Sequence, residues 1–389
     1  MTPNLEFGTL ANPEEAQHLG TILQQCFNFP ISKWQPYSSL LGLENYRVIR
    51  HRGQVIGGLG IYHMGQWFGG CSLPMAGIAA LGVAPEYRGI GAAAELMNST
   101  LHELYAKGVP LSTLYASTQR LYQKVGYEQA GNICQFSIPT SSLIPSAQMP
   151  ILRVDPASEE VFQDLYCQRA KETNGNLNRN RAIWKRVLQP PEDVVYAYLL
   201  GAHKPEGYIV FSQQSDTGGY NLKVTDLVVL TPAAGRCIWN FFANHRSLAN
   251  NIHWVGPAVE PLLTFLPEQT YKVIHLERWF LRVVNVPKAL MLRGYPPGVE
   301  TELHLEVKDE LLPENSKRFI LAVSKGRGEV TQGGRGELRL DVRGLAQLYT
   351  SLFTPHQLQV MGQIEATANA LSIAAQLFAG SEPWMSDHF

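Results

Sequence analysis

The sequence has few cysteines, and their positions exclude two common kinds of site. Five cysteines stand among 389 residues, at positions 26, 71, 134, 167 and 237. None of them is paired at the short spacing of metal ligands, and an odd number does not form a closed set of disulfides. The eleven histidines show no metal-binding spacing either. We expect buried free thiols in a reducing compartment and no metal site.

Long apolar runs and an excess of charge of one sign are also missing. No run of about 18 apolar residues occurs, and the N-terminal stretch has no basic segment ahead of an apolar one. Lys and Arg number 32 against 33 Asp and Glu, which gives a formal net charge of −1 at pH 7. These absences predict a cytoplasmic protein that crosses no membrane and binds no nucleic acid.

The first part of the chain predicts an α/β unit. Residues 12–27 have the N-cap and acidic first turn of a helix. Residues 45–70 alternate around a turn at 51–53 and predict a hairpin. A strand over 75–83 then leads into a helix over 91–107. A strand, a short helix and a last strand follow, up to residue 138.

The rest of the chain predicts two further domains. The stretch 139–150 is rich in Pro and Ser and is interpreted as a linker. After it, a helix, a hairpin turning at 204–207 and a strand–turn–helix repeat part of the first order. This partial recurrence favours a duplicated domain. After residue 286, strands and two helices predict an α+β module.

A glycine-rich turn at the mouth of a helix carries the chemistry. The stretch ALGVAPEYRGIGAAAEL, residues 80–96, joins a strand end to a helix through Arg88, Gly89 and Gly91. The first N–H groups of a helix are unpaired and carry partial positive charge, so they bind phosphate where the backbone is accessible. A dinucleotide motif would need glycine at position 94, and a P-loop would need Gly-Lys-Ser/Thr. The turn predicts a pyrophosphate site; tight packing is the alternative.

The same residues carry a resemblance to a known family. The stretch RGIGAA, residues 88–93, fits the Arg/Gln-x-x-Gly-x-Gly/Ala signature of the GCN5-related N-acetyltransferases. Residues 83–85 resemble the end of that family's fourth strand, and LYQKVGY, residues 121–127, resembles its Tyr-x-x-x-Gly-Tyr/Phe element. The resemblance implies acetyl-CoA as cosubstrate. The partial repeat at 229–232 lacks the signature, so only the first copy is expected to be active.

Over its full length the chain resembles the enhanced intracellular survival (Eis) family. This resemblance implies two tandem acetyltransferase-fold domains with mixed sheets, the second degenerate, and a sterol carrier protein-like α+β domain. We place these domains at 1–145, 146–285 and 286–389, with the joint between the last two inside 279–295. It also implies a homo-oligomer, a hexamer. The acceptors implied are primary amines of aminoglycoside-like polyamines, acetylated at more than one position.

Two alternatives remain open at this stage. The acceptor could be a protein lysine or the amine of a small metabolite. The chain could also be a non-enzymatic protein that binds an apolar ligand through its C-terminal domain, although the intact glycine turn argues against this.

The resemblance also implies roles for individual residues. Tyr122 matches the proton donor for the CoA thiolate, which is feasible because a phenol has a pKa near 10 and a thiol near 8.5. Phe389 matches a position whose terminal carboxylate holds the substrate ammonium, with Asp387 and His388 as alternatives. The residues expected to contact acetyl-CoA are Leu81, Gly82, Val83, Arg88, Gly89, Ile90, Gly91, Ala92, Ala93, Ala94, Ser117 and Thr118.

The acceptor pocket is the least determined part. Phe27, Phe29, Trp34 and Tyr37 stand in an aromatic-rich stretch after the first helix, interpreted as a loop, and they either shape the amine site or belong to the core. No cysteine falls at the thioester positions, which agrees with direct transfer in a ternary complex. The basic stretch 179–186 is expected to be a solvated surface.

Overall fold

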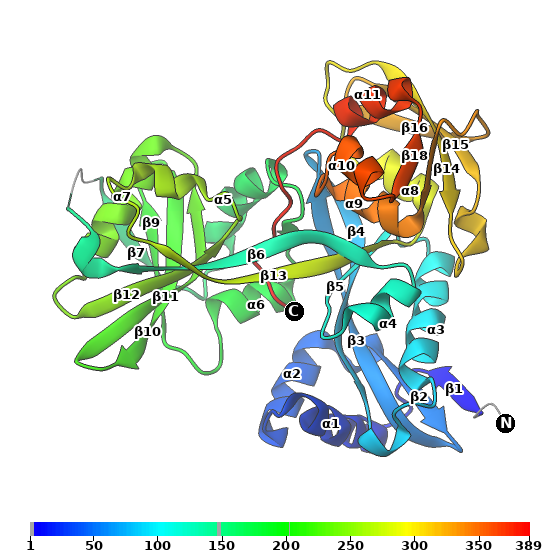
Figure 1. Ribbon diagram of the computed structural model, residues 1–389. Coiled ribbons are helices and arrows are strands. Elements are labelled where there is room, and N and C mark those ends of the chain that lie inside the picture. Colours follow the sequence, from blue (N-terminus) through cyan, green and yellow to red (C-terminus); the bar gives the residue numbers. More distant parts are fainter. Residues whose placement is uncertain (1–3, 146–148, 202) are drawn as a thin grey trace.

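The computed structural model of the protein describes residues 4–145, 149–201 and 203–389. It consists of two sheets and their helices (Figure 1). The predicted linker at 139–150 lies partly outside the described residues. In the part that is described, no helix is both long enough and apolar enough to cross a membrane.

The first part of the chain forms an α/β unit with helices on both sides of its strands. Its strands are β1 (Leu5–Gly8), β2 (Tyr46–His51), β3 (Gln54–Phe68), β4 (Cys71–Val83), β5 (Leu111–Tyr115) and β6 (Glu128–Pro139). Its helices are α1 (Pro13–Phe27), α2 (Trp34–Leu41), α3 (Ala92–Ala106) and α4 (Gln119–Lys124).

The middle part repeats this plan with fewer elements. Its strands are β7 (Ile151–Val154), β8 (Leu177–Asn178), β9 (Val195–Leu200), β10 (Gly207–Asp216), β11 (Gly219–Val229), β12 (Ala249–Gly256) and β13 (Lys272–Val283). Its helices are α5 (Glu160–Lys171), α6 (Arg181–Leu188) and α7 (Pro232–Ala243).

The last part has its own sheet, in the order β16-β15-β14-β17-β18. Its strands are β14 (Thr301–Lys308), β15 (Arg318–Ser324), β16 (Arg327–Gln332), β17 (Leu338–Asp341) and β18 (Ile364–Ala366). Its helices are α8 (Val286–Leu292), α9 (Val342–Thr350), α10 (Pro355–Val360) and α11 (Ala368–Leu377).

One continuous sheet runs through the first two parts. The order is β1-β2-β3-β4-β5-β13-β6-β12-β11-β10-β9-β7, with β8 paired to β3. Strand β13 lies between β5 and β6, and its last five residues, Trp279 to Val283, pair with β5. Figure 1 shows β6 and β13 as a long pair passing from one part to the other. The segment 279–295, predicted as a joint between domains, thus begins inside a central strand that its sequence did not predict.

Several local predictions are confirmed. Asn12 caps α1 by accepting a hydrogen bond from the Glu15 N–H at 2.8 Å. The first hairpin turns where predicted, with Arg52 and Gly53 at positive φ. The thiols are all free, but Cys71 is exposed, so the expectation of five buried thiols was wrong.

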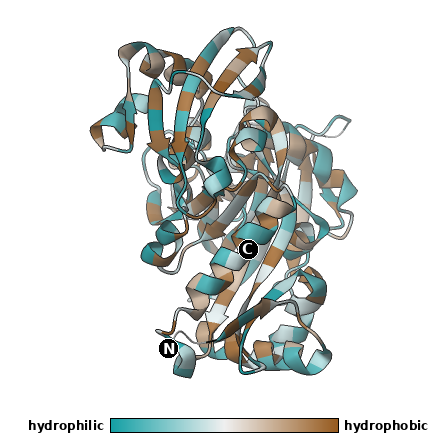
Figure 2. Ribbon diagram, turned by 90° about the vertical axis from the view of Figure 1, so that its right-hand side faces the viewer, coloured by the Kyte–Doolittle hydropathy of each residue, from teal (hydrophilic) through white to brown (hydrophobic). Residues whose placement is uncertain are grey.

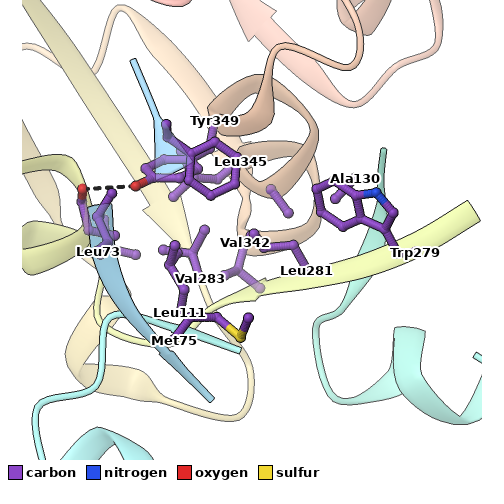
Figure 3. Close-up of a cluster of buried hydrophobic side chains, with 14 of the residues drawn as sticks. Leu73, Met75, Leu111, Ala130, Trp279, Leu281, Val283, Val342, Leu345 and Tyr349 are labelled. Carbon is purple, nitrogen blue, oxygen red and sulfur yellow. Dashed lines mark hydrogen bonds between the residues drawn. The ribbon is translucent and has the colours of Figure 1, made fainter. Parts of the chain in front are cut away.

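The last part of the chain packs directly on the shared sheet. Figure 3 shows side chains of α9 against side chains of β4, β5 and β13. Val342, Leu345 and Tyr349 of α9 belong to the same buried cluster as Met75 of β4 and Val283 of β13. The three parts therefore share hydrophobic core.

A charge pair fixes α3 to the sheet and gives a stability prediction. Two hydrogen bonds of 2.6 Å join Arg47 of β2 to the carboxylate of Glu103. These bonds, with a smaller contribution from Lys107, lower the pKa of Glu103 to about 2 in spite of its burial. A carboxyl with a lowered pKa in the folded state stabilises the protein above its unfolded pKa, and this contribution is lost as the pH falls.

We expect Glu103→Gln to lower the free energy of unfolding at pH 7 by about 1–2 kcal/mol, allowing for solvent screening of a partly exposed group. Urea denaturation should show the difference from wild type shrinking between pH 5 and pH 3. The control is Lys107→Gln, which removes the exposed partner and should cost less than about 0.5 kcal/mol. A difference that does not change with pH would contradict the assignment.

Candidate active site

Strands β4 and β5 pair and then diverge. Their parallel pairing runs from Met75 opposite Leu111 to Gly77 opposite Thr113. Beyond Gly77, β4 continues to its end paired with β3. A bulge bends β4 at this point, where Ala80 has a positive φ of 51°. On the side away from β3, the end of β4 over residues 81–83 has no strand partner, so its backbone groups there are candidates to pair with amide groups of a ligand, apart from the Val83 carbonyl, which accepts from Arg88 and Cys26.

The glycine turn opens the start of α3. Gly91 is the N-cap at φ 91°, and no side chain caps the helix. Gly89 has φ 85°, and a Cβ atom at either glycine would meet nothing within 4 Å. The positive φ explains the choice of glycine, and the space above it leaves the first N–H groups of the helix accessible to a pyrophosphate. The turn therefore fits the cofactor predicted for it.

The other predicted cofactor residues surround this turn unequally. Ile90, Ala93 and Ala94 are half-buried, while Ala92 is buried against the core, so it can offer only backbone groups. Ser117 and Thr118 are exposed at the start of α4. Within the described residues, no group of three or more His, Cys, Asp or Glu is arranged to hold a metal ion.

Arg88 folds back toward the end of β4. Its Nε donates to the Val83 carbonyl at 3.4 Å, and its Nη2 lies 3.8 Å from the Cys26 Sγ. The Cys26 thiol also donates to the Val83 carbonyl at 3.4 Å. A thiol from α1 therefore lies beside the strand end, which the sequence positions alone did not reveal.

Tyr122 lies on α4, buried at 5% exposure. Burial raises the pKa of its phenol, and a hydrogen bond with Ser117 lowers it by a smaller amount. The phenol is therefore protonated at neutral pH, as a proton donor must be. Tyr127 packs edge-on against Tyr122, and its hydroxyl lies 2.6 Å from the Ser112 Oγ in the core, so Tyr127 is a structural residue.

Phe389 reaches the point where β4 and β5 diverge. Its ring is 7% exposed and lies 6.0 Å, between centroids, from both Tyr62 and Tyr115. A Cβ atom at Gly77 would lie 2.6 Å from this ring, so only glycine leaves room for it. In both views the C-terminus lies inside the outline of the molecule (Figure 1, Figure 2). The last residue is therefore a packed part of the first unit.

A buried arginine of the second unit holds the tail in place. Arg179 pairs with Asp387 at 3.0 Å and with Asp226 of β11 at 2.5 Å, and its side chain is fully buried. The expectation that 179–186 forms a solvated surface was therefore wrong for Arg179, because two carboxylates neutralise it inside the protein. Tyr115 adds a hydrogen bond from its hydroxyl to the Asp387 carbonyl at 2.9 Å.

The two alternatives to the Phe389 carboxylate are engaged otherwise. The Asp387 side chain is paired with Arg179, which occupies it. His388 stacks on Tyr115 with ring centroids 4.1 Å apart, and burial lowers its pKa. Both side chains therefore already have partners within the protein.

Tyr122 and Phe389 belong to opposite faces of the sheet. Tyr122 is part of the buried cluster formed with α3, whereas Phe389 is part of the cluster that includes residues of α1 and α2. Beyond Gly77 and Thr113, β4 and β5 are no longer paired with each other, and we call this unpaired region the gap between them.

The aromatic residues predicted for the acceptor pocket divide into core residues and accessible residues. The stretch after α1 contains helix α2, so its interpretation as a loop was wrong. Trp34 is 3% exposed and packs on Gly20 and Tyr46 as a core residue. Phe29 lines a surface hollow of about 590 Å³ at the end of α1, and Phe27 is 46% exposed. Of these, Phe27 and Phe29 are accessible to a ligand.

The glycine turn gives a binding prediction. We expect Gly91→Val to raise the Kd for acetyl-CoA at least tenfold, because a side chain at a φ of 91° strains the turn and covers the helix N–H groups. Isothermal titration with acetyl-CoA measures this. Gly218→Val is the matched control, since Gly218 also has positive φ and open space but lies in the β10–β11 turn. Equal affinity in both variants would refute the pyrophosphate site.

Three family models match successive parts of the chain. Residues 9–130 and 175–283 each match an acetyltransferase (GNAT) domain, and residues 286–386 match a sterol carrier protein domain. In the second unit, Thr231 caps α7 through a hydrogen bond from the Ala234 N–H at 3.2 Å. The α7 N–H groups are thus partly satisfied internally, unlike those of α3.

Two solved structures match nearly the whole length, and a curated relative matches most of it. A GCN5-related N-acetyltransferase from Anabaena variabilis is 48% identical, with a TM-score of 0.96 over 99% of this chain and 100% of its own. A GCN5-related N-acetyltransferase from Kribbella flavida is 26% identical, with a TM-score of 0.88 over 100% and 99%. The N-acetyltransferase Eis of Mycobacterium tuberculosis is 27% identical over 71% of each chain.

The fold, the glycine turn and the matches to family models agree on the class of protein. The protein is an N-acetyltransferase, and its family uses acetyl-CoA as the acetyl donor. The chain belongs to the GCN5-related N-acetyltransferases, in the arrangement of two acetyltransferase domains and a sterol carrier protein-like domain that is also expected for Eis-like proteins. The predictions of family, fold class and enzyme type are confirmed.

Proposed function

We propose that the first unit transfers the acetyl group of acetyl-CoA to a small primary amine in a ternary complex. The observation that carries this proposal is the gap between β4 and β5, with Tyr122 on one face and Phe389 on the other. Acetyl-CoA supplies an activated acetyl thioester. The β4 end and the α3 N-terminus would hold it by backbone groups, and Arg88 would add one positive charge.

The residues of the chain then have separate tasks in the proposed reaction. The Phe389 carboxylate anchors the ammonium group and receives its proton, through water, so that the nitrogen has a free electron pair. The bond from nitrogen to the acetyl carbon forms as the bond from carbon to sulfur breaks. Tyr122 gives its proton to the departing sulfur, a general-acid contribution of about 10²–10⁴-fold.

The surroundings of the tail support a small acceptor. The rings of Tyr62, Tyr115 and Phe389 lie together. Arg186 lies close to Tyr62 and Glu277 lies close to His388, while Asp387 is paired with Arg179. An aromatic surface of this kind is suited to an acceptor that carries a single amine and is otherwise uncharged. Polycationic acceptors of the aminoglycoside type, expected from the Eis resemblance, stay a prediction, as does a protein lysine.

The predicted homo-oligomer has one supporting observation. The first half of β13 pairs with β6 only, and its apolar residues Val273, Ile274 and Leu276 are about half exposed. Such a strand edge is suited to a second copy of the chain. Light scattering after gel filtration would measure the mass; a monomer at micromolar concentration would contradict the hexamer.

An amine panel tests the proposed function. Release of CoA is followed with a monoamine, a polyamine, an aminoglycoside and a lysine peptide, and the acetyl groups per acceptor are counted by mass. We expect turnover with small primary amines and intersecting initial-velocity lines. Turnover with the peptide alone would show that the acceptor is a protein lysine. Parallel double-reciprocal plots of initial velocity, together with loss of turnover in Cys26→Ser, would indicate a covalent acetyl-enzyme intermediate.

A further inference from the structure

The second unit has its own cleft at the position that the active-site gap occupies in the first. Strands β11 and β12 pair in parallel from Tyr220 opposite Ala249 to Lys223 opposite His253, and the pairing then ends. A cavity of about 770 Å³ opens between the ends of the two strands. Its walls are largely apolar and include Leu227, Val229, Val255, Pro257, Leu262 and Phe265. This volume is typical of sites for small organic molecules.

This cleft is unsuited to a second acetyl-CoA. Its helix α7 begins with Pro232, which has no N–H, and Thr231 already caps the Ala234 N–H. The Thr231 hydroxyl donates to the carboxylate of Glu206, which places a negative charge where a pyrophosphate would lie. The second unit therefore has a cleft at the position that corresponds to the proposed acetyl-CoA site of the first, but its helix N-terminus is not suited to bind a pyrophosphate.

The charged groups of the cleft favour a cation. Three carboxylates, Glu172, Glu260 and Glu382, and one guanidinium, Arg169, line it. Glu382 is paired with Arg278 at 3.2 Å, and Arg169 donates to the Leu227 carbonyl at 2.7 Å. This leaves two carboxylates that form no ion pair within the described residues.

Glu260 is the more enclosed of the two. Its carboxylate caps the helical turn Pro261–Phe265 by accepting from the Leu262 N–H at 3.0 Å. A Cβ atom at Gly256 would overlap its Oε2, so the carboxyl rests directly on the end of β12. Glu172 is exposed at the rim.

We propose that this cleft is a second ligand site, which binds an organic ammonium ion with an apolar body and places the ammonium group at Glu260. The apolar walls bury the body, and Glu260 neutralises the charge. Trp384, which lies 5.2 Å from the Arg169 guanidinium, closes one side. This tail residue stands five positions before Phe389, so the occupant contacts the segment that ends in the first active site.

The ionisation of Glu260 supplies a pH readout. Burial raises its pKa to about 7, against smaller lowering effects of the Leu262 N–H, Arg169 and Trp254. The charged groups that face it are Arg169 of α5, Glu172 just beyond the end of α5, and Glu382 of the tail. A permanent cation should therefore bind roughly tenfold more tightly at pH 8 than at pH 6, because the ionised fraction of the carboxyl rises by about that factor.

The test is calorimetric titration with hexyltrimethylammonium, which cannot be acetylated and keeps its charge at every pH. Wild type should bind it, and neither hexanoate nor 1-hexanol should match its affinity at pH 8. Glu260→Gln should weaken binding at least tenfold and remove the pH dependence. The variant should fold, since it replaces a buried carboxyl by a neutral group of the same shape.

Two further variants make the result specific. Glu172→Gln, the matched change at the rim, should weaken binding by less than about threefold. Val229→Phe, which fills the cleft without changing charge, should abolish binding. Undiminished binding in both Glu260→Gln and Val229→Phe would place the cation elsewhere and overturn the proposal. Stronger binding of hexanoate, through the unpartnered Nε of Arg169, would also overturn it, as would no binding at all.

Discussion

Adding one glycine after Phe389 should lower kcat/KM for amine acetylation by about 10²-fold. The tail cannot slide to absorb the extra residue, because Arg179 holds Asp387 at 3.0 Å and the Phe389 ring fills the space above Gly77. The carboxylate would therefore move by about 3.8 Å, one residue along the chain. A displacement of about 1 Å in a reacting group can already cost 10²-fold. Steady-state kinetics with the best amine of the panel measures the effect.

The control separates the carboxylate from the ring. Phe389→Leu keeps the terminal carboxylate in place and changes the packing, so it should lose less activity than the extended chain. Binding of acetyl-CoA should be unchanged in both variants, since the glycine turn is distant in sequence and contacts other groups. An extended chain with wild-type turnover would remove Phe389 from the mechanism.

Replacing Tyr122 with Phe should lower kcat by about 10²–10³-fold and leave the KM for acetyl-CoA nearly unchanged. The ring still fills its place in the core, and only the hydroxyl that bonds with Ser117 is lost. The reason for the loss is that the sulfur would leave as a thiolate without a proton from the protein. Because burial raises the pKa of Tyr122, loss of activity through its ionisation is expected only at a higher pH than for an ordinary phenol.

Tyr127→Phe is the matched control. Tyr127 lies against Tyr122 and loses a comparable hydrogen bond, the one with Ser112. It should cost about 1 kcal/mol of stability and leave kcat within about twofold. If both variants lost activity equally, the effect of Tyr122→Phe would be one of packing and not of proton transfer.

The local elements were predictable because their signals are local. The Asn12 cap, the turn at Gly53 and the end of α3 at Ala106, just before Gly108 at positive φ, each depend on a few neighbouring residues. Strand β13 was not predictable in this way. Its partners on β5 lie far back in the chain, and a register between distant segments has no signature in either of them alone.

The same distinction between local and distant signals applies to the residues of the candidate site. The glycine turn and Tyr122 are parts of continuous motifs, so the sequence could single them out; the turn opens α3 and Tyr122 lies on α4, while their roles stay predictions. Arg179 was misjudged because a buried arginine and a solvated one look alike in sequence until Asp226 and Asp387 are seen beside it. Trp34 was ambiguous for a similar reason, since an aromatic side chain suits both core and pocket.

The placement of β13 has a consequence for how the chain folds during synthesis. The sheet of the first unit lacks its strand between β5 and β6 until residue 283 has been made. During synthesis of the second unit, the facing edges of β5 and β6 therefore lack the strand partner that β13 later provides. We expect the first unit to complete its folding only after β13 has been synthesised, and to fold slowly. Fragments that end before β13 should aggregate.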